Sequence, residues 1–515
     1  MISRTIYYRI ILITIIGFSS CFLSAKNDKP NIIVILVDDM GYSDLGCTGS
    51  EIKTPNLDKM ASEGVLFTHF YNASRCCPSR ASLLTGQYQW DAGIGHMDYT
   101  KSELPEYQGY LNNQSITIAE ALKDNGYQTF MSGKWHVGNK QREWWPDHRG
   151  FDQFYGTPAG GGLYFYPSQF YDRPVYWNGE EQTPDSTWYS TDAFTDYSID
   201  YIKNRRDKGK PFFMYLAYVA PHFPLQAKME DIDKYRDTYK VGYDVIRKAR
   251  FKKQKQLGIA SADLPASEPV YGDWETVENK NNEALKMAVY AAMVDCLDQN
   301  IGKLMSTLAD EHIDKNTVVM FLSDNGACQT SWNKTPEARL GSRDCNAAYG
   351  TWYNVSNTPY RMRKSQEHEG GIITPLIMHW PEGLKGRGVR ISEPAHITDI
   401  MPTCLDIAEA KYPVSYKNKV LDPLDGRSFM PLTRGIEQDK DRAYFWEHEG
   451  NRAVRVGDWK LVSLHKKDWE LYNLKADPYE MDNLVESHPD EKNELLKKYK
   501  IWADEHGVQR WPLKR

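Results

Sequence analysis

Continuous apolar runs alternate with segments of helical periodicity along most of the chain. Asn31–Val37 is the clearest run, because its β-branched residues continue without a polar interruption, as in a strand buried on both faces. Four further runs share this character: 128–132, 212–219, 317–323 and 374–380. Helical patterns lie between the runs, at 54–63, 117–125 and 285–308. This alternation predicts an α/β fold with a large, mostly parallel or mixed central sheet flanked by helices.

The last quarter of the chain has a different pattern. Four short strand-like segments occur at 443–449, 452–456, 459–463 and 469–473, and a helical pattern follows at 490–505. They predict a small antiparallel sheet with one covering helix. We therefore expect a large N-terminal domain over residues 27–435 and a small α+β subdomain over residues 440–515. The charged segment 228–263 is predicted to be a helical surface insertion.

The N-terminus has the pattern of an export signal. Arg4 and Arg9 precede an uncharged apolar run, 10–23, which is too short to span a membrane. We assign residues 1–25 to the signal. Either Cys21 becomes a lipidated first residue or a signal peptidase cleaves near Ala25. The protein is thus expected in the periplasm, or anchored to the outer membrane of a Gram-negative bacterium, with membrane contact only if Cys21 is lipidated.

Composition narrows the class of protein. The 515 residues include 41% hydrophobic residues, and 63 Lys and Arg stand against 69 Asp and Glu, giving a net charge of −6. These values are typical of a globular protein and give no reason to expect a nucleic acid partner. Aromatic residues and glycines gather in segment 143–188. They either line a pocket in which sugar rings stack or belong to ordinary loop packing.

Oxygen-bearing side chains follow two of the predicted strands. Asp38 and Asp39 come directly after the first run, and Asp324 and Asn325 come directly after the run at 317–323. In an α/β sheet, ligands bind beyond the carboxyl ends of the strands. Hard oxygen ligands favour Ca²⁺ or Mg²⁺ over Zn²⁺. The alternative is that these residues only cap the helices that follow.

A second cluster surrounds two adjacent cysteines. Cys76 and Cys77 lie between Arg75 and Arg80, and a helix is predicted to begin near Pro78. Positive charge and a helix N-terminus both favour a thiolate or another anion at this place. The alternative is a buried cysteine pair or a metal clip.

The motif Cys-Cys-Pro-Ser-Arg at 76–80, followed by Leu-Thr-Gly at 84–86, resembles the signature of the formylglycine-dependent (type I) sulfatases of the alkaline-phosphatase-like superfamily. Other segments resemble motifs of the same family along nearly the whole mature chain: 37–42, 54–58, 133–138, 220–224, 323–326, 369–371, 459–461, 469–474 and 477–480. The resemblance implies that a formylglycine-generating or an anaerobic sulfatase-maturating enzyme oxidises Cys76 to formylglycine (3-oxoalanine). It also implies that residues 27–435 form the catalytic domain.

The resemblance assigns roles residue by residue. One Ca²⁺ would be held by four oxygen ligands and would face the modified Cys76; the ligands are Asp38, Asp39, Asp324 and Asn325. Arg80 would hold the formylglycine hydrate, and Lys134 and Lys364 would bind sulfate oxygens. His136 and His222 would be the acid–base pair, with His222 also touching substrate. Residues 373–375 read Ile-Thr-Pro where many members of the family have Arg-Val-Pro, a difference that bears on substrate.

The substrate is less constrained than the chemistry. His96 and Trp332 are candidates for lining the pocket. We expect an exo-acting carbohydrate sulfatase for galactose-type sulfated sugars of host or algal glycans, with an aryl sulfate ester as an artificial substrate. The alternatives are a broad arylsulfatase, a phosphodiester or phosphonate-ester hydrolase with the same nucleophile, or an unmodified glycan-binding surface protein. Cys328 and Cys345 either form a disulfide or remain free and buried.

Overall fold

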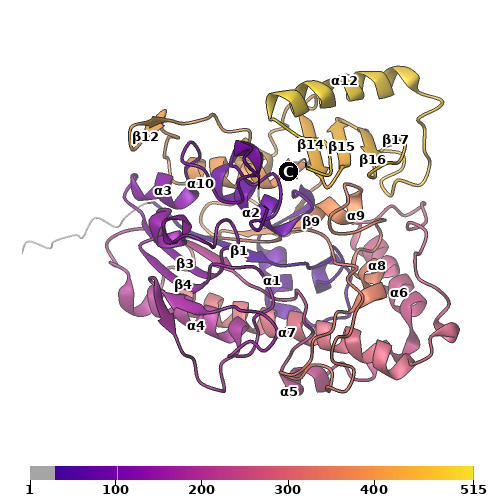
Figure 1. Cartoon of the computed structure of the whole chain (residues 1–515), viewed down its shortest axis with the longest axis horizontal. Coiled ribbons are helices and arrows are strands. Elements are labelled where there is room, and N and C mark those ends of the chain that lie inside the picture. The colour runs from indigo at the N-terminus through magenta and orange to yellow at the C-terminus, as the bar shows by residue number, and fades with distance from the viewer. Residues whose placement is uncertain (1–28, 101, 514–515) are drawn as a thin grey trace, which may run out of the picture.

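The computed structural model describes residues 29–100 and 102–513, and the chain folds around one large sheet (Figure 1). The predicted signal, including Cys21 and Ala25, lies outside the described residues. Within these ranges, no helix has both the length and the apolar character needed to cross a membrane.

The centre of the sheet is β1 (Asn31–Val37), which pairs in parallel with β7 (Phe212–Ala217) on one side and β8 (Thr317–Ser323) on the other. The strand order is β10-β2-β9-β8-β1-β7-β3-β4-β5-β6, with β11 pairing with β2. The remaining strands are β2 (Val65–Tyr71), β3 (Gln128–Lys134), β4 (Gln153–Thr157), β5 (Val175–Trp177), β6 (Glu180–Gln182), β9 (Ile373–His379), β10 (Val389–Ile391) and β11 (Ala395–His396). All seven residues of β1 are buried, so the prediction of a doubly covered strand is confirmed.

The sheet is mixed, because β9 runs antiparallel to both β8 and β2. The α/β class and the mixed central sheet are thus confirmed. Two strands have no clear apolar run: β2 carries Thr68 and His69 in its middle, and β4 includes Gly156 among its five residues, so neither was predicted.

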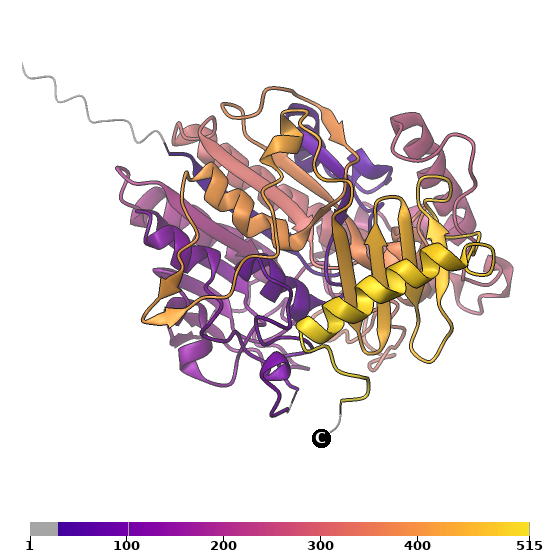
Figure 2. The same ribbon diagram turned by 90° about the horizontal axis from the view of Figure 1, so that it is seen from above.

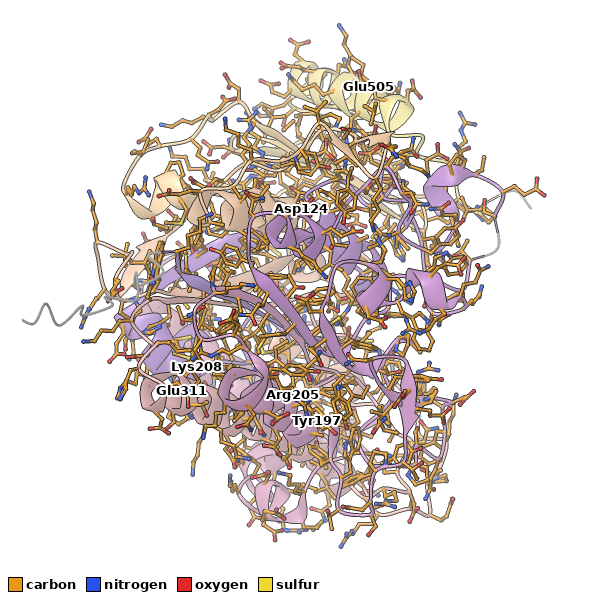
Figure 3. All side chains as sticks on the ribbon, turned by 90° about the vertical axis from the view of Figure 1, so that its left-hand side faces the viewer. Asp124, Tyr197, Arg205, Lys208, Glu311 and Glu505 are labelled. Carbon is orange, nitrogen blue, oxygen red and sulfur yellow. The ribbon has the colours of Figure 1, made fainter. Side chains whose placement is uncertain are left out.

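Helices cover both faces of the sheet, and the alternation of side chains along β1 divides the core between them. Ile33 and Ile35 join one apolar cluster, under α7 (Lys280–Asp310), whereas Val34 joins the other. The first layer also contains α1 (Pro55–Glu63) and α4 (Ser190–Asp200), and the second contains α2 (Cys76–Thr85), α3 (Ile118–Lys123), α10 (Ile400–Ile407) and α11 (Met430–Thr433). In Figure 3, Tyr197 on α4 and Glu311 after α7 mark the first layer, and Asp124 after α3 marks the second.

Segment 228–263 does form helices, α5 (Met229–Asp233) and α6 (Tyr243–Leu257), but it is more than a surface insertion. Ile232 of α5 and Ile246 of α6 are buried in the same apolar cluster as α7. Arg250 of α6 is fully buried, and its guanidinium lies 2.7 Å from Asp44 and 2.8 Å from Glu51. The charged residues misled the prediction because part of this charge is paired inside the protein.

The C-terminal part is the predicted antiparallel sheet with one helix, α12 (Pro489–Glu505), lying across it (Figure 2). Its strands are β14 (Ala443–His448), β15 (Asn451–Val456), β16 (Trp459–Ser463) and β17 (Glu470–Asn473). The other face of this sheet packs on the large part of the chain. There, Lys460 is buried between Glu369, at 2.7 Å, and Glu480, at 2.9 Å. The remaining α-helices and strands of the described residues are short: α8 (Tyr353–Ser356), α9 (Glu369–Ile372), β12 (Ser415–Tyr416) and β13 (Lys419–Val420).

Candidate active site

The carboxyl ends of β1 and β8 bring the four predicted oxygen ligands together. The parallel register pairs Val37 with Ser323, so the residues that follow each strand become neighbours. The backbone N–H of Asp39 donates to Oδ1 of Asp324 at 3.2 Å, and Nδ2 of Asn325 donates to Oδ1 of Asp39 at 2.7 Å. Asp39 holds a left-handed φ of 68°, a strained conformation that is common at functional sites.

Three of these side chains hold an oxygen that has no hydrogen-bond partner although it is buried. The atoms are Oδ1 of Asp38, Oδ2 of Asp39 and Oδ1 of Asn325. Burial, together with the nearby charge of Asp38, raises the pKa of Asp324 well above its ordinary value. Unpaired oxygens and crowded carboxylates are what a bound divalent cation would satisfy. The residues therefore fit a Ca²⁺ site of oxygen ligands.

Three buried cations surround the same carboxylates. Lys134, at the end of β3, places Nζ 2.5 Å from Oδ2 of Asp38, and Lys364 forms an ion pair with Asp39. Arg80 of α2 lies 3.0 Å from Oδ2 of Asp324 and donates to the backbone carbonyl of Lys134 at 2.9 Å. Burial alone would raise the pKa of Asp38, but Lys134, His222 and Arg80 hold that pKa below its ordinary value. The site thus concentrates positive charge in a chain whose total is acidic.

Cys76 is the first residue of α2, two residues before the predicted helix start at Pro78. Its side chain is buried, and a hydrogen bond from Cys77, together with Lys134, Lys364 and His136, lowers the pKa of its thiol well below the ordinary value against the effect of burial. The helix N-terminus adds to this effect. Position 76 is therefore built to carry a negatively charged group.

His222 faces the oxygen cluster from the loop after β7. Its Nε2 lies 3.5 Å from Oδ2 of Asp39, and its Nδ1 lies 2.6 Å from the backbone carbonyl of Phe223. Because a carbonyl only accepts, Nδ1 carries a proton and Nε2 is left to exchange one. Tyr164 donates to the backbone carbonyl of His222, a support that the sequence analysis missed.

His136 occupies the loop after β3, with a left-handed φ of 63°. Its Nε2 lies 3.6 Å from Oδ1 of Asp98, and the two residues are 6% and 4% exposed. Sequence reasoning missed Asp98, because a lone aspartate in a loop has no strand or motif to single it out. The ring of His136 is also close enough to Cys76 for the two to share a ligand.

Two glycines of segment 143–188 lie against these histidines. A Cβ atom on Gly160 would be 2.6 Å from Nε2 of His136, and one on Gly161 would be 2.8 Å from Nδ1 of His222. Nε of Arg173 donates to both glycine carbonyls at 3.1 Å. The glycines of this segment thus bring its backbone close to the two histidines. Many of its aromatic rings instead pack on other parts of the chain, as Tyr155 does on Tyr197.

The two pocket candidates lie further out. His96 stacks on His448 of the small sheet, and its Nε2 lies 3.1 Å from Oε1 of Glu449. Trp332 packs edge-on against Phe223, the neighbour of His222, with ring centroids 5.1 Å apart. The structure does not bring either residue into contact with the oxygen ligands, so their role in substrate binding stays a prediction. Cys328 and Cys345 are both free and buried.

Comparison with known proteins decides which chemistry this arrangement serves. The family model described as Sulfatase matches residues 30–410. The chain belongs to the sulfatase family. A second model, N-sulphoglucosamine sulphohydrolase, C-terminal, matches residues 362–503 of this sulfatase, including its small antiparallel sheet.

Relatives match this sulfatase over most of their length. An uncharacterized sulfatase of Schizosaccharomyces pombe is 36% identical over 94% of this chain and 95% of its own. The arylsulfatase of Klebsiella aerogenes is 34% identical over 80% of this chain and 93% of its own. The crystal structure of Ps i-CgsB in complex with k-i-k-neocarrahexaose matches with a TM-score of 0.71 and 28% identity, covering 92% of this chain and 93% of that one. The protein is therefore a sulfuric ester hydrolase.

Proposed function

We propose that this sulfatase removes sulfate from sulfated carbohydrates by exo action, on galactose-type sugars, with Ca²⁺ and a formylglycine derived from Cys76. The observation that carries the proposal is the position of Cys76. It begins a helix, is surrounded by Lys134, Lys364 and His136, and has a buried set of unpaired oxygens beside it. An unmodified glycan-binding protein would have no need for this combination.

Named relatives support a carbohydrate substrate. The mouse N-acetylgalactosamine-6-sulfatase is 30% identical over 87% of this chain and 75% of its own. The Ps i-CgsB structure holds k-i-k-neocarrahexaose. The first name is that of a sulfatase for a sugar, and the second structure of similar fold binds an oligosaccharide. An aryl sulfate ester would serve as an artificial substrate, as the arylsulfatase relative suggests.

Ca²⁺ would supply an electrophilic cation, and the hydrated formylglycine at position 76 would supply a doubly hydroxylated nucleophile. Asp38, Asp39, Asp324 and Asn325 would hold the cation. Lys134 and Lys364 bring two ammonium groups to the same carboxylates, where they would neutralise the non-bridging oxygens of a bound sulfate. Arg80 fixes helix α2 to the ends of β3 and β8 and would hold the side chain of residue 76 in place.

The two histidines divide the proton transfers. Nε2 of His222 would protonate the departing alcohol, since Nδ1 is committed to the carbonyl of Phe223. His136 lies on the side of Cys76 and would take a proton from the side chain of residue 76 when sulfate is expelled. Asp98 would hold the resulting imidazolium, as a carboxylate does for other catalytic histidines.

Two measurements test this function on protein made in its own host. Peptide mass spectrometry should find Cys76 as formylglycine, and sulfate should be released from at least one member of a panel of sulfated mono- and oligosaccharides. Unmodified Cys76 in active protein would overturn the nucleophile. Faster turnover of a phosphodiester or phosphonate ester than of every sulfate ester would overturn the substrate class.

Export is part of the same proposal. The signal-like residues 1–25 support a periplasmic or outer-membrane-anchored enzyme, lipidated at Cys21 in the second case. Maturation of Cys76 would require a formylglycine-generating or an anaerobic sulfatase-maturating enzyme. Mass spectrometry of the mature N-terminus distinguishes a lipidated Cys21 from a cleaved, unlipidated chain.

A further inference from the structure

A cavity of about 400 Å³ opens between the small sheet, helix α12 and the C-terminal tail. Gly450 and Arg452 of the β14–β15 hairpin form one side, and Tyr499 of α12 and Trp511 of the tail form another. Figure 2 shows α12 lying across the sheet and the tail turning back beneath it. None of these residues belongs to the sulfate-binding cluster described above.

The cavity is strongly cationic. Its lining includes four Arg and Lys side chains, Arg452, Lys466, Lys500 and Arg510, together with His465. Glu447 is the one acidic residue among the described lining residues, and burial raises its pKa to about 8. At neutral pH this carboxyl is therefore largely uncharged. Such an excess of positive charge in a chain with a net charge of −6 indicates an anionic ligand.

Hydrogen bonds join the cavity wall to the active site. Oδ1 of Asn451 accepts from the backbone N–H of His465 at 3.0 Å, and Nδ2 of Asn451 donates to the carbonyl of Ser365 at 2.8 Å. Ser365 directly follows Lys364, and its hydroxyl lies 2.5 Å from Nη1 of Arg75, the residue before Cys76. The cavity wall and the residue before the nucleophile thus both hydrogen-bond to Ser365, through Asn451 and Arg75, respectively.

Trp511 makes a second connection. Its ring stacks on His96 with centroids 4.9 Å apart and an angle of 28°. His96 in turn contacts Glu449, whose charge interacts with Arg75. A ligand that contacts Trp511 would therefore lie one side chain away from His96, which is linked through Glu449 to Arg75, the residue before Cys76.

We infer that this cationic cavity is a second binding subsite, which takes a sulfate or carboxylate group carried by a sugar residue beyond the one that is desulfated. The inference rests on the proposed function, and it narrows the substrate to an oligosaccharide that carries more than one anionic group. Arg and Lys side chains provide charge-assisted hydrogen bonds to such groups, and the partly exposed indole of Trp511 suits a sugar ring. A free sulfate ion carries the same anionic group as a sulfated sugar, so the experiment measures the binding of these two ligands separately.

The double variant Lys500→Ala/Arg510→Ala tests the subsite, because both side chains are exposed and lie outside the active site. The readouts are hydrolysis of 4-nitrophenyl sulfate and its inhibition by k-i-k-neocarrahexaose or by inorganic sulfate. We expect the inhibition constant of the hexasaccharide to rise about tenfold. Hydrolysis of 4-nitrophenyl sulfate and inhibition by inorganic sulfate should stay within about twofold of wild type.

The control is Lys475→Ala/Lys497→Ala, which removes the same charge from exposed positions outside the cavity lining. An equal rise in the inhibition constant of the hexasaccharide in the control would assign the effect to net charge and overturn the subsite. Three other results would also overturn the subsite. They are an equal rise in the inhibition constant of inorganic sulfate, an unchanged inhibition constant of the hexasaccharide in Lys500→Ala/Arg510→Ala, and no inhibition of wild type by the hexasaccharide. Failure of wild type to hydrolyse 4-nitrophenyl sulfate and every sulfated sugar would instead count against the proposed function.

Discussion

Gly160 lies directly against His136, so that a Cβ atom at position 160 would be 2.6 Å from the Nε2 atom of the histidine. Gly161 bears the same relation to His222. One glycine pair therefore sets the positions of both imidazoles, and Arg173 binds the carbonyl of each glycine. The loop thus contacts the acid–base pair through its glycine backbone, and its charged side chain Arg173 acts on that backbone and not on the histidines.

A methyl group at position 160 should displace His136. Gly160 does not have a left-handed φ, so Gly160→Ala adds steric overlap without backbone strain. We expect kcat to fall at least about tenfold, equivalent to about 1.4 kcal/mol, with Tm within about 3 °C of wild type. Gly272→Ala is the matched control, because the nearest atom to its Cβ is 4.0 Å away. Equal kcat in the two variants would refute the role of the loop.

Loss of Arg173 should loosen the same loop. Arg173→Ala removes the donor to two carbonyls, and the glycines are then free to move away from the histidines. We expect kcat to fall about tenfold while KM for a small aryl sulfate changes less than about twofold. Arg339→Ala, at an exposed position, supplies the control. A rise in KM alone would show that Arg173 binds substrate and does not position the loop.

Removal of Asn325 should weaken metal binding. Its Oδ1 is buried without a partner, and its Nδ2 orients Asp39, so Asn325→Ala deletes one ligand and releases another. Calcium titration followed by calorimetry should show at least about a tenfold weaker affinity, and EGTA should inactivate the variant at lower concentration than wild type. Asn333→Ala is the control, since its Oδ1 only accepts from the backbone of Thr335. Unchanged calcium affinity would contradict the ligand assignment.

Sequence patterns located the parts of the site that depend on strand ends. The apolar runs predicted β1 and β8 as buried strands. Because these strands pair in parallel, their carboxyl ends lie side by side, and Asp38 and Asp324, which follow them, are neighbours. The resemblance of motifs added Lys364, which lies in the long connection between β8 and β9 and reaches Asp39 through the conformation of that connection. No periodicity predicts that approach.

The parts that the sequence did not predict depend on loop conformation and on paired charge. Asp98 reaches His136 from a loop whose path has no repeating pattern. The expected role of His96 in lining the substrate pocket stays a prediction, but no sequence pattern indicated its stacking on His448 of the small sheet, a contact between residues 352 positions apart in the chain. Arg250 was assigned to the surface because single-sequence hydrophobicity cannot reveal that Asp44 and Glu51 neutralise it.

Serine at position 76 should stop the cycle after one turnover. In Cys76→Ser the Oγ atom can attack sulfur and release the alcohol, but no second hydroxyl remains to expel the bound sulfate. We expect steady-state turnover at least about a hundredfold lower, with about one equivalent of alcohol released per enzyme in a rapid first phase. Cys77→Ser serves as the control and should keep most of its activity. Near-normal steady-state activity of Cys76→Ser would contradict the cycle.

Glu447 should make stability depend on pH between about 4.5 and about 8. Burial raises its pKa from 4.5 to about 8 in the folded protein, so the folded state holds a proton that the unfolded state has lost in this range. The folded state therefore loses stability as pH rises from about 4.5 to about 8, and no further loss follows above it. Glu447→Gln keeps an oxygen that accepts from the backbone of Gly450 and cannot ionise.

The difference in Tm between Glu447→Gln and wild type should therefore be small at pH 5 and grow by several degrees up to pH 8.5, with the variant the more stable. Glu437→Gln is the control, because Glu437 is exposed and pairs only with exposed Lys440. Differential scanning calorimetry at three pH values measures both variants. A constant difference across this range would mean that Glu447 is ionised in the folded protein at neutral pH, and its negative charge would then oppose an anionic ligand in the cavity that it lines.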